Sequence, residues 1–209
     1  MKLIVLALVL SCSATIVHPV GQSARQQHDS MVLVQKVCPD GSKGFGTGIL
    51  VAPDRVLTAT HVVKCEIVPG MPLYMDPTNI KVSITKTQTL DAKIEVEVSG
   101  FDVSRLKLKD KSFAPYFSEV SVGPKPDIGE RVCQVSAVPR STYRCGEVQF
   151  SAVDRILFGH PVESGNSGSG VFDSKGRLVG IVTNLIRCQD GVICSGYGTS
   201  LASFEWLVP

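Results

Sequence analysis

The stretch Gly165–Asn184, "GNSGSGVFDSKGRLVGIVTN", holds the pattern that decides the fold. It presents a serine inside a glycine-rich turn, Ser167, continues into a turn signal at Asp173–Gly176, and ends in a run of β-forming residues. Serines in glycine-rich turns are common, so this stretch alone also fits an ordinary surface turn. Its interpretation depends on what the rest of the chain supplies.

Short runs of β-forming residues occur throughout the chain from Met31 onward, separated by turn signals such as Pro39–Gly41. The runs are "MVLVQKV", "GTGILVA", "IKVSITKT", "KIEVEVSG", "RVCQVSAV", "GEVQFSAV" and "GRLVGIVTNL". Helical periodicity is scarce, and only "LASFEWL" near the end fits a helical turn or two. This pattern predicts an all-β fold, a sandwich or barrels. The Pro- and Gly-rich stretch at 121–130 is the predicted linker between two halves.

The composition is that of a packed globular protein. Hydrophobic residues make up 44% of the 209 residues and charged residues only 19%, which excludes a disordered chain. The net charge of +2 is too small to indicate binding to nucleic acid or to an acidic membrane surface.

The first residues have the pattern of a targeting signal. Lys2 precedes an apolar run, Leu3–Leu10, and small residues follow up to Ala14. We expect a signal peptide over residues 1–14, a polar tether over 15–30, and a secreted or periplasmic protein. The stretch "VLSC" also resembles a bacterial lipoprotein box, in which a lipid on Cys12 would be the only contact with a membrane. Plain secretion and lipidation both remain open.

The cysteine count agrees with an exported protein. Of the seven cysteines, six remain once Cys12 is removed or lipidated, and an even number predicts up to three disulfides. No two cysteines have C-x-x-C spacing, and the histidines do not complete a zinc-binding set, so we expect no metal and no cofactor.

Three residues in a particular order suggest a catalytic function. His61 lies in the run "RVLTATHVV", Asp102 opens the strand of "GFDVSRLKL", and Ser167 follows. Each residue alone has an ordinary structural explanation. A serine hydroxyl becomes a nucleophile when a histidine accepts its proton and a carboxylate orients that histidine. Since no histidine follows Ser167 and position 169 is serine, the α/β-hydrolase order and its G-x-S-x-G elbow are excluded.

These motifs resemble the trypsin-like (chymotrypsin-fold) serine endopeptidases over residues 31–209. "GTGILVAPDRVLTATHVV" is similar to the family's histidine segment, and "DVSRLKL" to its aspartate strand. The turn "GNSG" at 165–168 is similar to that of bacterial HtrA and glutamyl-endopeptidase members. The resemblance implies two six-stranded antiparallel β-barrels, at about 31–120 and 131–209, with the active site in the cleft between them.

The resemblance also implies the roles of individual residues. His61, Asp102 and Ser167 would form the catalytic triad, and the N–H groups of Gly165 and Ser167 the oxyanion hole. The substrate would be a protein or peptide, hydrolysed through an acyl-enzyme intermediate. The alternatives are a catalytically inactive binding protein and an esterase, both on the same fold.

Two departures from the family limit what is carried over. Asn166 stands where animal trypsins have an aspartate that pairs with a newly cut N-terminus, so we expect no trypsin-style activation. The chain ends soon after Ser167, so we expect no PDZ domain of the HtrA kind, and no oligomeric state is inferred.

The specificity pocket follows from the resemblance alone. Pro161 takes the position of the trypsin aspartate, Val182 that of a histidine in glutamate-specific members, and Leu185 that of a trypsin glycine. We therefore predict cleavage after small or medium apolar residues such as Val, Ala or Leu. We interpret His160 as a loop residue.

The disulfide pairing combines the resemblance with local spacing. Many trypsin-like proteins have a bridge around the histidine segment, which pairs Cys38 with Cys65. Cys133 and Cys145 bracket an expected hairpin, and Cys188 and Cys194 close a short loop; we pair each set locally.

Overall fold

The computed structural model describes residues 27, 29–67, 73–85, 87–98, 100–138, 143–187 and 193–209. The expected signal peptide, most of the expected tether and Cys12 lie outside these residues. Among the residues described, no helix is both long and apolar enough to cross a membrane.

The first half of the chain forms a closed antiparallel barrel with the strand order β1-β2-β3-β8-β7-β6. Pairing of the first strand with the sixth, for example Val34 with Val82, closes the cylinder. A short helix and a two-stranded sheet connect β3 to β6. The elements are β1 (Met31–Val37), β2 (Lys43–Ala52), β3 (Arg55–Ala59), α2 (Thr60–Val63), β4 (Cys65–Glu66), β5 (Tyr74–Met75), β6 (Asn79–Ser83), β7 (Thr89–Val98) and β8 (Val103–Leu108).

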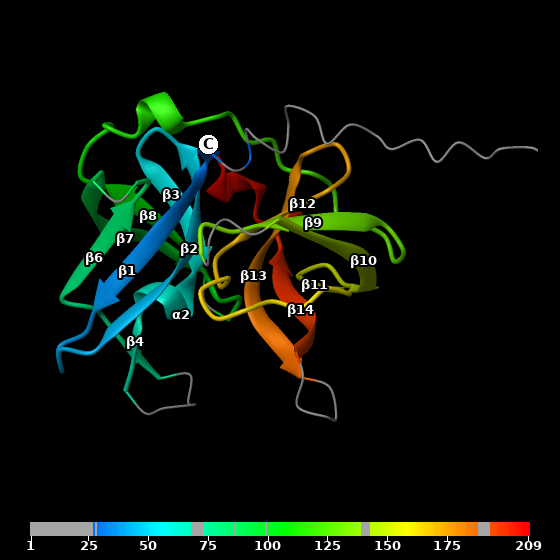
Figure 1. Ribbon diagram of the computed structural model, residues 1–209, viewed down its shortest axis with the longest axis horizontal. Helices are drawn as coiled ribbons and strands as arrows, with labels where there is room; N and C mark the ends of the chain where they lie inside the picture. Colours follow the sequence, from blue (N-terminus) through cyan, green and yellow to red (C-terminus); the bar gives the residue numbers. More distant parts are fainter. Residues whose placement is uncertain are drawn as a thin grey trace, which may run out of the picture.

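The second half forms another closed antiparallel barrel, with the order β10-β11-β14-β13-β12-β9. Figure 1 shows the two barrels side by side, the first in blue to green and the second in yellow-green to red. The elements are η1 (Ala114–Tyr116) between the barrels, then β9 (Arg131–Val135), β10 (Tyr143–Ser151), β11 (Arg155–Phe158), β12 (Gly170–Phe172), β13 (Leu178–Arg187), β14 (Ile193–Ser200) and η2 (Glu205–Leu207). The predicted all-β fold of two six-stranded barrels is confirmed.

Each barrel has its own apolar core, and a third cluster joins them. In that third cluster Ile49 and Leu57 from the first barrel pack with Phe172 and Ile181 from the second. Burial of side chains of this size contributes roughly 1.5–3 kcal/mol each. The barrels are therefore held in a fixed relative orientation by packing as well as by the connecting chain.

The C-terminal segment completes this junction. Phe204 and Leu207 belong to the joining cluster, and the ring of Phe204 lies 4.9 Å from that of Phe101. Arg105 on β8 donates hydrogen bonds of 3.2 Å to the carbonyls of Trp206 and Leu207. In Figure 1 this segment, in red, lies against the first barrel. The end of the chain thus fastens the second barrel to the first.

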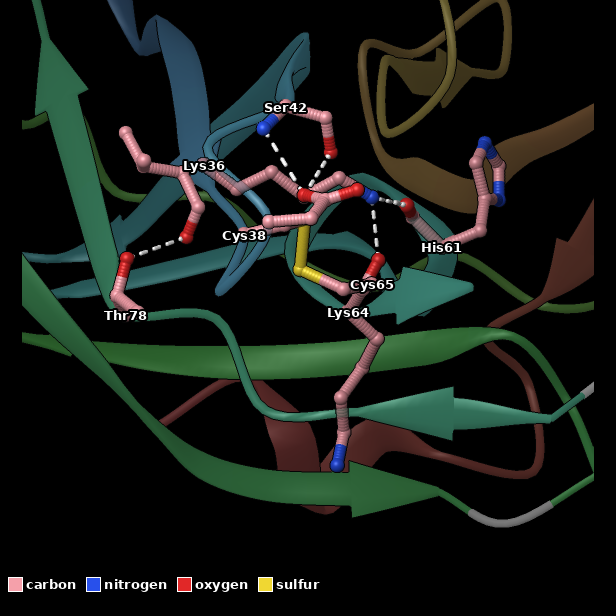
Figure 2. The surroundings of a disulfide bond; sticks show 9 residues. Lys36, Cys38, Ser42, His61, Lys64, Cys65 and Thr78 are labelled. Atoms are coloured by element: carbon pink, nitrogen blue, oxygen red, sulfur yellow. Dashed lines mark hydrogen bonds between the residues drawn. A yellow bond between two sulfur atoms is a disulfide. The ribbon is translucent and has the colours of Figure 1, made fainter. Parts of the chain in front are cut away.

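Two of the predicted disulfide pairings are present, one in each barrel. Cys38 after β1 is bonded to Cys65 after α2, with Cα atoms 5.8 Å apart (Figure 2). Cys133 and Cys145 are bonded directly across the β9–β10 ladder. The predicted pairing of Cys188 with Cys194 falls on side chains outside the described part of the chain.

Candidate active site

His61 and Asp102 form a doubly hydrogen-bonded pair. Strand β3 ends at Ala59, and α2 carries His61 in its first turn, facing the start of β8. His61 Nδ1 lies 2.7 Å from one carboxylate oxygen of Asp102, and the backbone N–H of His61 donates to the other at 2.9 Å. A carboxylate accepts only, so it favours the tautomer with the proton on Nδ1 and leaves Nε2 as a base.

Asp102 holds this position in a left-handed backbone conformation. Its φ is +54°, and Gly100 two residues earlier has φ of +82°. Aspartate is one of the few residues with a side chain that tolerate this region, and such conformations concentrate at functional sites. The same turn lets the carbonyl of Asp102 accept a 3.1 Å hydrogen bond from the N–H of Thr60.

Lys36 supports His61 from the other side. Its ammonium donates a 2.7 Å hydrogen bond to the carbonyl of His61 and a second hydrogen bond to the carbonyl of Lys64 (Figure 2). Gly44 lies opposite Lys36 in the β1–β2 ladder, and a Cβ there would lie 2.6 Å from Lys36 Cε. Burial lowers the pKa of Lys36, while the Glu66 carboxylate acts in the opposite direction. No sequence motif marks this lysine, because its role depends on the space that Gly44 leaves opposite it.

The turn that carries Ser167 docks against the first barrel. The N–H of Thr47 on β2 donates a 2.8 Å hydrogen bond to the carbonyl of Ser167. At Gly168, with φ of +85°, a Cβ would lie 1.9 Å from the Thr47 carbonyl and 3.1 Å from the backbone nitrogen of Ala59. Only glycine fits there, and the contact brings the serine turn next to the residues that precede His61.

A second close approach places the same turn beside α2. A Cβ on Gly46 would lie 2.8 Å from the Ser167 carbonyl oxygen and 2.6 Å from a methyl carbon of Val62. Val62 directly follows His61, so at Gly46 strand β2 lies against both the backbone of Ser167 and the residue next to His61. The structure therefore brings together the three segments of the predicted triad.

The backbone of the turn leaves two donors available. The N–H of Asn166 donates to the Glu163 carbonyl at 2.9 Å, and that of Gly168 to the Val182 carbonyl at 2.7 Å. Within the described part of the chain, the N–H groups of Gly165 and Ser167 have no such acceptor. Two unoccupied donors beside a serine are suited to bind a developing oxyanion.

The three predicted pocket residues have different surroundings. Pro161 is exposed, and Leu185 on β13 is 36% exposed. Val182 is 1% exposed and packs in the core of the second barrel, while its backbone forms hydrogen bonds with the turn that carries Ser167. Glu163 forms an ion pair with Arg144, so its charge is compensated.

His160 is buried, although it follows the strand β11 in a loop. Its ring lies 4.5 Å from that of Phe158, and its Nε2 has no hydrogen-bond partner among the described residues. Burial is the main reason that the pKa of His160 is lowered, and the Arg144 charge acts in the same direction. His160 is therefore held neutral against the barrel core.

Two six-stranded barrels that meet at a serine-bearing turn define the class of chymotrypsin-type peptidase folds. The family model described as trypsin-like peptidase domain matches residues 46–181, and the chain belongs to that family. The resemblance found in the three sequence motifs is thereby confirmed.

Individual relatives agree with this membership. Exfoliative toxin A of Staphylococcus aureus is 25% identical over 181 residues, which cover 76% of this chain and 62% of the toxin. The chain thus spans less than two thirds of that toxin's length.

Solved structures show the same fold at low identity. A protease from M. tuberculosis in its active form matches with a TM-score of 0.69 at 17% identity, over 90% of this chain and 84% of that one. A serine endoprotease from Yersinia pestis matches with a TM-score of 0.68 at 18% identity, over 90% and 65%. The HtrA-type protease AlgW with tripeptide gives 0.67 at 16% identity, over 85% and 58%.

Proposed function

We propose that this protein is a serine endopeptidase in which Ser167, His61 and Asp102 form the catalytic triad. The observation that carries the proposal is the double hydrogen bond between His61 and Asp102. The docking of the Ser167 turn on β2, beside α2, adds support.

The chemistry follows from these positions. Asp102 keeps the proton on Nδ1 of His61, so Nε2 accepts the proton of the Ser167 hydroxyl as the oxygen attacks the peptide carbonyl. The resulting oxyanion accepts hydrogen bonds from the N–H groups of Gly165 and Ser167. His61 then passes its proton to the leaving amine. Water, deprotonated by the same Nε2, hydrolyses the acyl-enzyme and restores Ser167.

The proposed substrate is a polypeptide cut after a small or medium apolar residue. Pro161 brings no charge to the position that binds basic side chains in trypsins. Glu163, a carboxylate of the same loop, already pairs with Arg144. A lysine or arginine side chain entering this region would lose water without gaining a partner.

We also propose that the protein acts outside the cytoplasm. The two disulfides form and persist in oxidising compartments, and the N-terminal pattern is that of an export signal. The mass of the mature N-terminus distinguishes plain secretion from a lipid on Cys12, because only the latter adds acyl chains.

The test of the activity combines turnover with labelling. Wild-type protein should hydrolyse fluorogenic peptides or casein. Its rate enhancement over the uncatalysed reaction should be larger for a peptide than for the matched ester. A fluorophosphonate should label one residue in each molecule. Ser167→Ala should abolish both signals. Ser164→Ala, an exposed serine of the same loop, is the matched control and should keep both. Equal labelling of the Ser167→Ala variant would reject the proposed nucleophile.

A further inference from the structure

Asn166 is a buried amide inside the nucleophile turn. It is 1% exposed, and all of its side-chain polar atoms have partners. Its Nδ2 donates to the carbonyl of Val138 at 2.6 Å and to Ser136 Oγ at 3.1 Å. Its Oδ1 accepts from the N–H of Glu163 at 2.8 Å. The amide therefore links the turn to the segment that follows β9.

A second polar side chain links that segment and the turn to the first barrel. Thr47 Oγ1 on β2 lies 2.9 Å from Ser136 Oγ and donates to the carbonyl of Gly165 at 2.9 Å. Its N–H donates to the carbonyl of Ser167. Thr47 and Ser136 are both 0% exposed, so water does not compete for these hydrogen bonds.

Together these contacts fix the backbone on both sides of the two available donors. The N–H of Glu163 and the carbonyl of Gly165 are held by Asn166 and Thr47, and the peptide between Ser164 and Gly165 lies between them. The carbonyl of Asn166, in the same peptide group as the N–H of Ser167, accepts from Ser169. Gly165 has φ of +91°, so without these bonds its backbone has wide freedom to rotate.

We propose that Asn166 is a positioning residue whose amide, through Val138, Ser136 and Thr47, holds the oxyanion-binding turn in its reactive shape. The proposal rests on the proposed peptidase function. In this proposal the neutral amide of Asn166 orders the turn. The ammonium group of a newly cut N-terminus is therefore not needed as a partner at this position.

The variant Asn166→Asp has nearly the same shape but no N–H donors. Its carboxylate would face the carbonyl of Val138, which is a second acceptor, so burial and repulsion should raise the pKa of the new carboxyl. Protonation returns one O–H donor to the same place. Among the residues that the structure describes, the titratable groups around the turn are the Glu163–Arg144 pair, the His61–Asp102 pair and His160, which stands in the same loop with its pKa lowered by burial. Because wild type contains these groups as well, the ratio of variant to wild-type activity removes their own titration.

The experiment measures kcat and KM for wild type and Asn166→Asp between pH 5 and pH 8. At pH 8 we expect kcat of the variant to fall about 10²- to 10³-fold, the loss typical of one oxyanion donor, with KM nearly unchanged. The ratio of variant to wild-type kcat should rise about tenfold or more as the pH falls to 5. A ratio that does not change with pH would overturn the proposal.

Two further variants test the proposal in case the Asn166→Asp variant does not fold. Ser136→Ala and Thr47→Val remove one hydroxyl each and introduce no charge, so each should lower kcat by about tenfold at constant KM, with no pH-dependent ratio. Unchanged kcat in both, with folding verified by circular dichroism, contradicts the proposal. Wild type that neither hydrolyses peptides nor reacts with fluorophosphonate rejects the peptidase function itself, before any variant is compared.

Discussion

The two barrels support their parts of the site by different means. The first barrel holds His61 with charged groups, the carboxylate of Asp102 and the ammonium of Lys36. The Ser167 turn, which belongs to the second barrel, is instead held by neutral amides and hydroxyls, those of Asn166 within the turn and of Thr47 on β2 of the first barrel. Under the proposed mechanism, charged partners suit a base that becomes an imidazolium during turnover, whereas neutral donors suit a turn that keeps one shape at every step.

The largest expected effect comes from removing either member of the His61–Asp102 pair in the first barrel. His61→Ala should lower kcat by about 10⁴- to 10⁶-fold, because no other group accepts the serine proton. Asp102→Asn should lower kcat by about 10⁴-fold, because an amide donor at that place favours the wrong tautomer. Kinetics on one fluorogenic peptide provide both values. A loss of less than tenfold in either variant would remove that residue from the triad.

The next effect concerns the point where the second barrel touches the first. Gly168→Ala places a methyl group 1.9 Å from the Thr47 carbonyl, in addition to the positive φ. We expect a loss of about 3 kcal/mol or more in the free energy of unfolding, and loss of activity. Gly129→Ala is the control, because Gly129 has φ of +87° but nothing within 4 Å of a Cβ. It should cost only about 1 kcal/mol in urea unfolding.

A smaller effect tests whether the ammonium of Lys36, which lies outside the His61–Asp102 pair, also contributes to activity. Lys36→Met should lower kcat by about tenfold and reduce stability by about 1.5–3 kcal/mol, since two carbonyls lose a charged donor. Lys64→Met is the matched control. Its ammonium pairs instead with Asp76 and Glu97, at 2.9 and 3.0 Å near the surface, where such pairs contribute about 1 kcal/mol or less. Equal kcat for both variants would contradict a role for Lys36.

The smallest expected effect concerns His160 in the second barrel, whose uncharged state should make stability depend on pH. The pKa of His160 in the folded protein lies below its usual value of 6.5, so the unfolded chain binds more protons just below that pH. Stability should therefore fall as the pH drops from 6.5 toward the lowered pKa. His160→Phe should flatten this slope in thermal unfolding scans from pH 7.5 to 5. An unchanged slope would place the acid sensitivity elsewhere.

The sequence was sufficient to predict features that depend on local pattern or on motif order. The β-runs predicted an all-β fold, and the resemblance of the three motifs implied the two barrels, which are present. The contact between His61 and Asp102 joins two of these motifs. Lys36 could not be predicted, because its contacts depend on the register that sets it opposite Gly44. Nor could the Thr47–Ser136 contact, which joins residues 89 positions apart through the packing of two barrels. Val182 illustrates a further limit, since matching a motif position does not say which face of a strand a side chain occupies.

Because the C-terminal segment packs against the first barrel, the order in which the chain is synthesised determines when the site can be completed. All strands of the first barrel, with His61 and Asp102, precede residue 109, so a growing chain completes its base and carboxylate early. Ser167 emerges later, and Phe204 and Leu207, which complete the packing between the barrels, emerge after it. Under the proposed mechanism, a nascent chain therefore stays inactive at least until Phe204 and Leu207 have been made.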